Sequence, residues 1–375
     1  MISFSRTDSG IFGAWWWTVD RVMLFSFFAI MIFGVLMAAA ATPMVANRIG
    51  LERFYFLKRH LAYMIPSLLT IFFVSTFDNA MIKKFSLALF ALSIGLIVLT
   101  LLMGAETKGA KRWVMLFGFS IQPSEFAKPA LMIITAWMFA KEQETKGFRG
   151  RFMASISLSL LVFLLLLQPD IGMILVTTSC WFGQLFLNGL SLWLVLGAVV
   201  FFLISALLAY MFFPHVTLRV DKFFNPAVGD HYQINRSLEA FSNGGLWGTG
   251  PGEGIIKKHL PDAHSDFVFA VLGEEFGFVV CLAVIILLCF IVVYGMTKAL
   301  KENDLFSILA SVGLLAQFGL QSFINIASTV HLIPTKGITL PFMSYGGSSM
   351  LAASISVGMI LALGKHKNIS YAGVG

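Results

Sequence analysis

Four carboxylates and one histidine lie within the fourteen residues 262–275, where a long apolar run begins. A carboxylate within hydrogen-bond reach of a hydroxyl can take its proton as the hydroxyl attacks, which is general-base catalysis. Asp266 stands at the mouth of the apolar run, where a substrate held at a membrane surface would meet it. We expect Asp262 to shape a turn, and Glu274 and Glu275 to form hydrogen bonds or position a helix. His264 could orient Asp266 or be purely structural.

A second pair of charges lies inside an apolar segment, in "QPSEFAKPALM". Glu125 and Lys128 are three residues apart and therefore share one face of a helix. Charges in a membrane span are costly and usually functional or paired. The pair is expected to be a salt bridge that holds two helices together, the wall of a polar cavity, or both. Asp170 opens another span, where helix capping and a functional role are equally consistent with its position.

Two further clusters carry cations and hydrogen-bond donors. Lys111, Arg112 and Trp113 precede the Glu125 segment, and Lys336 precedes a Gly-Gly-Ser-Ser stretch that includes Ser348. Such residues can stabilise a departing phosphate, and a helix start rich in glycine and hydroxyls can face an anion. Contact with lipid phosphates and interfacial anchoring by tryptophan are the alternatives. A divalent cation, Mg²⁺ or Mn²⁺, could share the task, although no carboxylate spacing demands one.

The rest of the chain predicts a membrane protein that positions these groups. Its 375 residues have a mean hydropathy of +0.86 and are 58% hydrophobic, which favours many spans over a water-soluble core. We predict an all-α integral membrane protein with about ten transmembrane helices and both termini on one side. The apolar runs are 22–42, 61–77, 85–103, 124–140, 153–167, 170–187, 192–213, 267–297, 305–330 and 348–364.

The chain is expected to be one polytopic domain, residues 1–375, with a large extracytoplasmic loop at 214–266. A weak bias of Lys and Arg favours a cytoplasmic N-terminus. The loop contains "GGLWGTGPGEG", which lacks the spacing of a nucleotide site, so we predict a mobile loop near lipid head groups. The net charge of +7 is scattered among loops, which favours anionic lipid or a phosphorylated lipid substrate over nucleic acid.

Three segments, "QPSEFAK", "LPDAHSDFVFAVLGEE" and "PTKGITLPFMSYGGSS", resemble the signature segments of the SEDS (shape, elongation, division and sporulation) family. The resemblance spans nearly the whole chain and is greatest to the division branch. It implies ten spans, cytoplasmic termini, and a periplasmic loop between spans seven and eight. It places the family's essential acid on Asp266 and its lysine-bearing motifs on Lys128 and Lys336.

The resemblance also implies peptidoglycan glycosyltransferase activity on lipid II, the undecaprenyl-pyrophosphate-linked disaccharide peptide. It implies a class B penicillin-binding protein and other division proteins as partners at the septum of the bacterial inner membrane. In this scheme Asp266 is the base of an inverting reaction. The substrate is expected to contact Lys111, Arg112, Trp113, Glu125, Lys128, His264, Lys336 and Ser348. A lipid II flippase and a non-catalytic division scaffold are the alternative functions.

Overall fold

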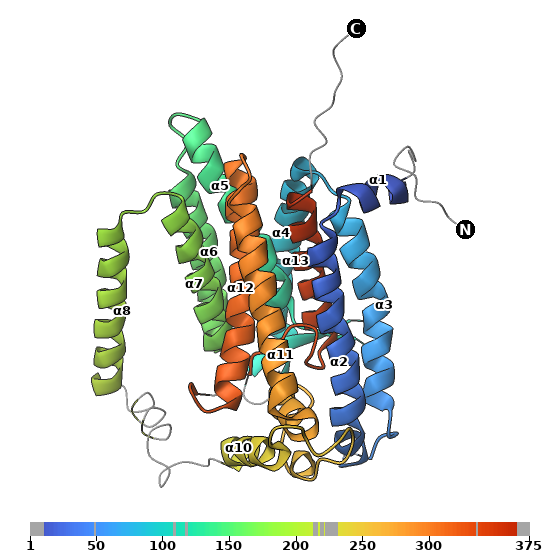
Figure 1. The fold of residues 1–375 in the computed structure, drawn as a ribbon. Helices are drawn as coiled ribbons and strands as arrows, with labels where there is room; N and C mark the ends of the chain where they lie inside the picture. The colour runs from blue at the N-terminus through green and yellow to red at the C-terminus, as the bar shows by residue number, and fades with distance from the viewer. Residues whose placement is uncertain are drawn as a thin grey trace.

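The computed structural model describes residues 11–48, 50–107, 110–116, 119–212, 217, 221, 232–334 and 337–365. It forms a bundle of long helices with a small sheet (Figure 1). The elements are α1 (Ile11–Thr18), α2 (Arg21–Arg48), α3 (Tyr55–Ser75), α4 (Asn79–Met103), β1 (Ala105–Thr107), β2 (Ala110–Leu116), β3 (Phe119–Ile121), α5 (Pro123–Glu144), α6 (Gly150–Leu167), α7 (Ile171–Leu187), α8 (Leu192–Phe212), α10 (Tyr232–Gly244), the 3₁₀ helix η1 (Ile256–Lys258), α11 (Val268–Ala299), α12 (Leu305–Thr329) and α13 (Gly347–Leu363).

Apart from one or two residues at their ends, the ten predicted apolar runs lie in described helices, and the all-α membrane fold is confirmed. Six described helices have the length and apolar composition to cross a membrane, and α7 and α13 are shorter apolar helices. The six are α2, α3, α4, α6, α11 and α12. The count of ten crossings stays a prediction.

Helices α5 and α12 form the centre of the bundle. The most apolar part of α12 is 72% buried, against 22% for α3, which therefore lies at the periphery. Helix α5 packs against α4, α6, α12 and α13, and this enclosure lets it carry charged side chains that lipid would not tolerate. Helix α8 stands to one side (Figure 1), and Trp193 on it is 83% exposed.

Small polar residues allow the helices to approach closely. Helix α4 buries a residue every three or four positions, so that serine, threonine and bulky apolar side chains follow one another along one stripe. The hydroxyls of Ser93 and Thr100 donate to carbonyls of their own helix, which removes the cost of burying them. The buried stripe is Ile82, Ser86, Phe90, Ser93, Ile97 and Thr100.

Three features were not predicted. The strands β1, β2 and β3 form an antiparallel sheet between α4 and α5. The described part of the 214–266 segment contains α10 and η1 rather than only loop. Helix α11 is interrupted at Gly277, where φ is 77° and ψ is 178°, so that it consists of a short helix, 268–276, and a long one, 278–299.

The two ends of the bundle differ. Helix α1 and the C-terminal end of α13 lie at one end, and α10 lies across the opposite end (Figure 1). Asp266 precedes the start of α11 and is therefore at the end that carries α10, because α10 packs on α11 through its contacts with the short helix.

Candidate active site

Asp266 lies in a series of turns that leads into α11. The carbonyl of Asp262 accepts hydrogen bonds from the amides of Ser265 at 3.0 Å and Phe267 at 3.3 Å. Asp262 has a φ of 53°, a conformation that aspartate tolerates better than most residues. The structure thus agrees with a turn-forming role for Asp262, and it leaves Asp266 half-buried just before the helix.

A second loop, residues 337–346, fastens onto these turns. The hydroxyl of Ser344 donates to the carbonyl of Ser265 at 2.6 Å, and the amide of Tyr345 donates to the carbonyl of His264 at 2.8 Å. The Asp266 carboxylate faces the start of this loop, because a Cβ placed on Gly337 would lie 3.6 Å from Asp266 Oδ2. Lys336 precedes Gly337 in the chain but lies outside the described residues.

Two amide side chains of α12 support both loops. Asn325 Nδ2 donates to the carbonyls of Asp266 at 3.0 Å and Ile338 at 2.7 Å. One turn earlier, Gln321 Nε2 donates to the carbonyl of Thr339 at 3.1 Å. Neither Asn325 nor Gln321 was singled out in the sequence. The available signal is their spacing of four in an otherwise apolar span, which places them on one helix face.

Glu125 and Lys128 form a buried ion pair. Lys128 Nζ lies 2.9 Å from Glu125 Oε2, and the two side chains are 1% and 5% exposed, respectively. The pair is within α5 and does not itself join two helices. Lys128 makes that connection by donating to Gln321 Oε1 of α12 at 3.0 Å. This network links the buried charges of α5 to the loop beside Asp266.

Of the pair, Glu125 alone lies in the wall of a cavity, the second role expected for these charges. Glu125 lines a hollow between α5, α12 and α13 together with Gln317, Gln321 and Ser349. Ser349 exchanges a hydrogen bond of 2.7 Å with Thr339, so the hollow borders the second loop. The hollow has room for about one water molecule, and apolar side chains of α12 and α13 line it beside these polar groups.

Ser348 and His264 have different surroundings. Ser348 is 4% exposed near the start of α13, and its hydroxyl has no hydrogen-bond partner in the described part of the chain. The His264 ring packs against Phe56, with centroids 5.2 Å apart, and against Tyr345 at 5.8 Å. These contacts hold the imidazole in place, and its expected role in orienting Asp266 stays a prediction beside the structural one.

The predicted cluster of residues 111–113 lies in β2, against the turn between α6 and α7. Arg112 Nε donates to the carbonyl of Gln168 at 3.1 Å, and its Nη2 donates to that of Pro169 at 2.6 Å. Arg112 Nη1 is also 3.7 Å from Asp170 Oδ2. Arg112 therefore satisfies carbonyls at the end of α6, while Lys111 is exposed and Trp113 half-buried. Their contacts with substrate stay predictions.

Asp170, Glu274 and Glu275 have structural partners. Asp170 caps α7, since its side chain accepts from the amide of Met173 at 3.3 Å. Glu274 accepts three hydrogen bonds, and Glu275 pairs with Lys257, which the sequence reading missed. The predicted hydrogen-bonding role of the two glutamates agrees with this geometry.

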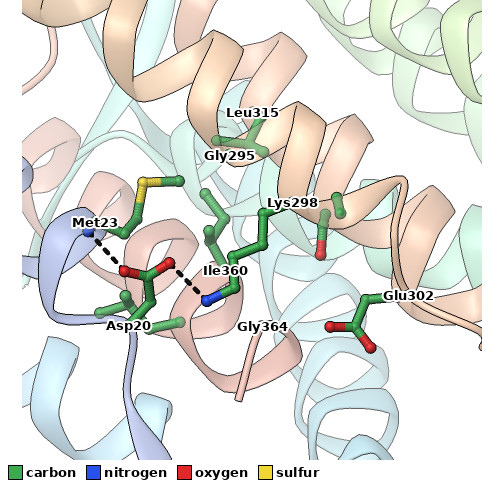
Figure 2. Close-up of a pocket in the computed structure, with 11 residues that line it drawn as sticks. Asp20, Met23, Gly295, Lys298, Glu302, Leu315, Ile360 and Gly364 are labelled. Carbon is green, nitrogen blue, oxygen red and sulfur yellow. Dashed lines mark hydrogen bonds and ion pairs between the residues drawn. The ribbon is translucent and has the colours of Figure 1, made fainter. Parts of the chain in front are cut away.

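A separate hollow is lined by Asp20, Met23 and Lys298 (Figure 2), and it lies where α2 begins and α11 ends, opposite the end that carries α10 (Figure 1). Asp20 accepts hydrogen bonds there from Lys298 Nζ at 2.7 Å and from the amide of Met23 at 3.0 Å. Burial raises the pKa of Asp20, but the hydrogen bonds from Lys298 and Met23 lower it by more, so the net shift is downward. The ion pair joins the start of α2 to the end of α11 and is far along the bundle from Asp266.

The described residues hold no group of three His, Cys, Asp or Glu side chains that could ligate a metal ion. A cation bound mainly through substrate phosphates needs only one or two protein carboxylates. Asp266 is a carboxylate of the kind that could serve, and no reaction step is assigned to a metal.

Comparison with known proteins supports the motif reading. The FtsW/RodA/SpoVE family, described as cell cycle protein, matches residues 20–369. The probable peptidoglycan glycosyltransferase FtsW of Caulobacter vibrioides is 39% identical over 374 residues, covering 100% of this chain and 96% of that protein.

Two solved structures share the fold. A chain in a peptidoglycan synthase complex, described as coordinating polymerization and crosslinking, aligns with a TM-score of 0.78 and 26% identity, over 92% of this chain and 97% of that one. The rod shape determining protein RodA of Thermus thermophilus aligns with a TM-score of 0.67 and 25% identity, over 93% and 97% of the two chains.

Proposed function

This chain belongs to the SEDS family of cell cycle proteins and is FtsW-like, and we propose that it polymerises lipid II with Asp266 as the general base. It is a peptidoglycan glycosyltransferase, the activity named for its FtsW relatives. The observation that carries the assignment of Asp266 is its placement. Asp266 is half-buried, its backbone carbonyl accepts a hydrogen bond from Asn325 of α12, and it directly precedes α11 at the end of the bundle that carries α10.

The reaction transfers a glycan chain between two lipid-linked sugars. The 4-hydroxyl of the N-acetylglucosamine of an incoming lipid II attacks the anomeric carbon of the growing glycan. A new carbon–oxygen bond forms as the bond from that carbon to the pyrophosphate oxygen breaks, with inversion at the carbon. The hydroxyl proton passes to the Asp266 carboxylate, and the bonding electrons leave with the polyprenyl pyrophosphate. General-base assistance of this kind contributes about 10²–10⁴ in rate.

The cations of the site have two tasks. Lys336, next to Gly337 in the chain, stabilises the charge that develops on the departing pyrophosphate. Lys128 fixes the side chain of Gln321, which lines the polar hollow, and its own charge is balanced by Glu125 when no substrate is bound. Ser348, at the start of α13, donates a hydrogen bond from its hydroxyl to the substrate. Lys111 and Trp113 guide the lipid-linked substrate from the neighbouring sheet, while Arg112 holds the turn after α6 beside them.

The active end of the bundle faces the periplasm of a bacterial inner membrane. The chain crosses the membrane ten times as one polytopic domain, with both termini cytoplasmic and residues 214–266 periplasmic. The placement of α1 and the end of α13 opposite α10 supports this topology (Figure 1). A pyrophosphate-linked sugar lies at head-group depth, so its catalytic groups belong at the end of a span rather than at mid-membrane.

The protein acts with a class B penicillin-binding protein at the division septum. Support comes from the likeness to a chain of a peptidoglycan synthase complex that couples polymerization with crosslinking. The fold of this chain supplies the polymerising site, and the partner would supply the crosslinking one.

The direct test is synthesis of glycan polymer from purified lipid II by the purified full-length chain, with and without a class B partner. We expect polymer that requires Asp266. Transport of lipid II between leaflets without polymer would favour the flippase, and partner binding without either activity would favour the scaffold.

A further inference from the structure

The interruption of α11 at Gly277 would leave backbone groups unpaired. Its φ of 77° with ψ of 178° belongs to a region that only glycine occupies readily. A break at this point removes hydrogen bonds that a continuous helix would make between neighbouring turns. Such a break is tolerated in a membrane protein where other protein groups satisfy the backbone.

The segment 245–250 supplies hydrogen-bond partners for four backbone groups on the two sides of the break. The amides of Thr249 and Gly250 donate to the carbonyls of Glu274 at 2.9 Å and Glu275 at 3.0 Å. In the other direction, the amides of Phe278 and Val279 donate to the carbonyls of Gly245 at 3.0 Å and Leu246 at 3.3 Å. We call this arrangement of residues 244–250 with 273–279 the glycine clasp.

Glycine is required because backbone packs directly on backbone. A Cβ on Gly277 would lie 2.4 Å from the nitrogen of Gly248, and a Cβ on Gly248 would lie 2.2 Å from the carbonyl oxygen of Glu275. A Cβ on Gly244 would lie 2.0 Å from the carbonyl oxygen of Gly273. These backbone atoms cannot move aside as a flexible side chain could. The glycine-rich stretch is therefore a fitted part of the fold, and the expectation of a mobile loop is wrong for its described residues.

Buried side chains add a second attachment. Glu274 is fully buried and accepts hydrogen bonds from Asn243 Nδ2 at 3.1 Å and from the amides of Ile256 at 2.7 Å and Lys257 at 2.9 Å. Its neighbour Glu275 pairs with Lys257 Nζ, which also donates to the carbonyl of Ala40 in α2 at 3.1 Å. The C-terminal end of the short helix is thus attached to the loop and, through Lys257, to α2.

The short helix, 268–276, connects the glycine clasp to the reaction. Asp266 lies two residues before its first residue, and its opposite end is held by the clasp. A continuous α11 would instead orient Asp266 along the axis of the long helix. We propose that the glycine clasp is a positioning element that sets the orientation of the short helix and so places the Asp266 carboxylate for proton transfer. The inference rests on the proposed function, and Gly248 and Gly277 are its positioning residues.

The test compares two glycines that share a positive φ but differ in contacts. Gly248 has a φ of 83° and meets Glu275, whereas Gly252 has a φ of 86° and nothing within 4 Å of an added Cβ. Gly248→Ala and Gly252→Ala therefore carry similar backbone strain, and only the first forces the clasp apart. Polymerisation of lipid II by purified full-length protein gives kcat and KM, and hydrogen exchange reports the amides of residues 249–250 and 278–279.

We expect Gly248→Ala to lower kcat by about 10-fold or more, because small misplacements of a reacting group have large effects on rate. KM should stay within about 2-fold, since a general base acts mainly in the transition state. The clasp amides should exchange faster in this variant. Gly252→Ala should resemble the wild type in all three readouts.

Equal kcat for the two alanine variants would overturn the inference, as would a fall confined to KM. If Gly248→Ala does not accumulate, Glu274→Gln is measured in the same way, with the same kcat loss and unchanged KM expected. Wild-type protein that forms no polymer would refute the proposed function instead, and the exchange experiment would still show whether the clasp exists.

Discussion

The ion pair between Lys257 and Glu275 allows a quantitative test of how the loop is fastened. The side chains are 1% and 0% exposed, and Lys257 also donates to the carbonyl of Ala40. Within the described residues, Glu275 Oε2 has no hydrogen-bond partner, so Lys257 is the main compensation for this buried acid. Lys257→Met leaves the buried Glu275 carboxylate without its cation, and we expect a loss of about 3–5 kcal/mol in the free energy of unfolding.

The double variant should lose less free energy of unfolding than the two single variants lose together. Glu275→Leu alone strands the Lys257 ammonium and should also cost about 3–5 kcal/mol. Lys257→Met combined with Glu275→Leu removes both charges and takes the Lys257 donor from the Ala40 carbonyl, so it should cost only about 1–3 kcal/mol. The difference between the double variant and the sum of the singles is the coupling energy of the pair.

The assay is reversible unfolding of purified protein in mild detergent titrated with a denaturing detergent. Lys58→Met is the matched control, because Lys58 pairs with Glu52 on an exposed surface and its loss should change stability little. Single variants at Lys257 and Glu275 that unfold like the control, with a double variant equal to their sum, would refute a buried, mutually dependent pair.

Three further predictions concern the site and the topology. Lys128→Ala and Lys336→Ala should each weaken use of lipid II in the polymerisation assay while the protein still inserts and folds. Lys128→Ala should also lower the free energy of unfolding, because it strands the buried Glu125, and loss of folded protein in both variants would indicate a structural role. Arg112→Ala should lower the unfolding temperature more than it lowers lipid II binding, because its donors are bound to the turn after α6; a selective loss of binding would instead place Arg112 at the substrate. In a Cys289→Ser background, a cysteine at the exposed Glu253 should react with an impermeant reagent in intact cells after outer-membrane permeabilisation; labelling only after inner-membrane lysis would contradict the topology.

The helices were predictable because each depends on local composition. A run of about twenty apolar residues has few alternatives to a membrane helix, and polar starts such as "QPSE" mark where one begins. The resulting bounds, for example 348–364 expected and Gly347–Leu363 observed, differ by one residue. The close pair of runs on either side of "QPDI" also appears as two helices, α6 and α7.

The missed features depend on contacts between distant segments. Gly277 looks like an ordinary glycine in an apolar run, and only segment 245–250, about thirty residues earlier, makes a break there acceptable. Arg112 appeared as a free cation because the carbonyls that it binds lie more than fifty positions away. Lys257 was overlooked because its burial depends on α2 and α11 together. The local pattern of the acidic segment, in contrast, correctly separated the turn at Asp262 from the helical glutamates.

The central claim is that Asp266 takes the proton of the attacking hydroxyl, and Asp266→Asn tests it most directly. Asparagine has nearly the shape of aspartate and can still form hydrogen bonds, although its Nδ2 donates where a carboxylate oxygen accepts, and it cannot take up a proton at neutral pH. Glycan polymer formed from purified lipid II should fall at least about 10²-fold, with lipid II binding and membrane insertion nearly unchanged. Asp262→Asn, four residues away in the turn, should be mild by comparison. Near-normal polymer from Asp266→Asn would contradict the assignment.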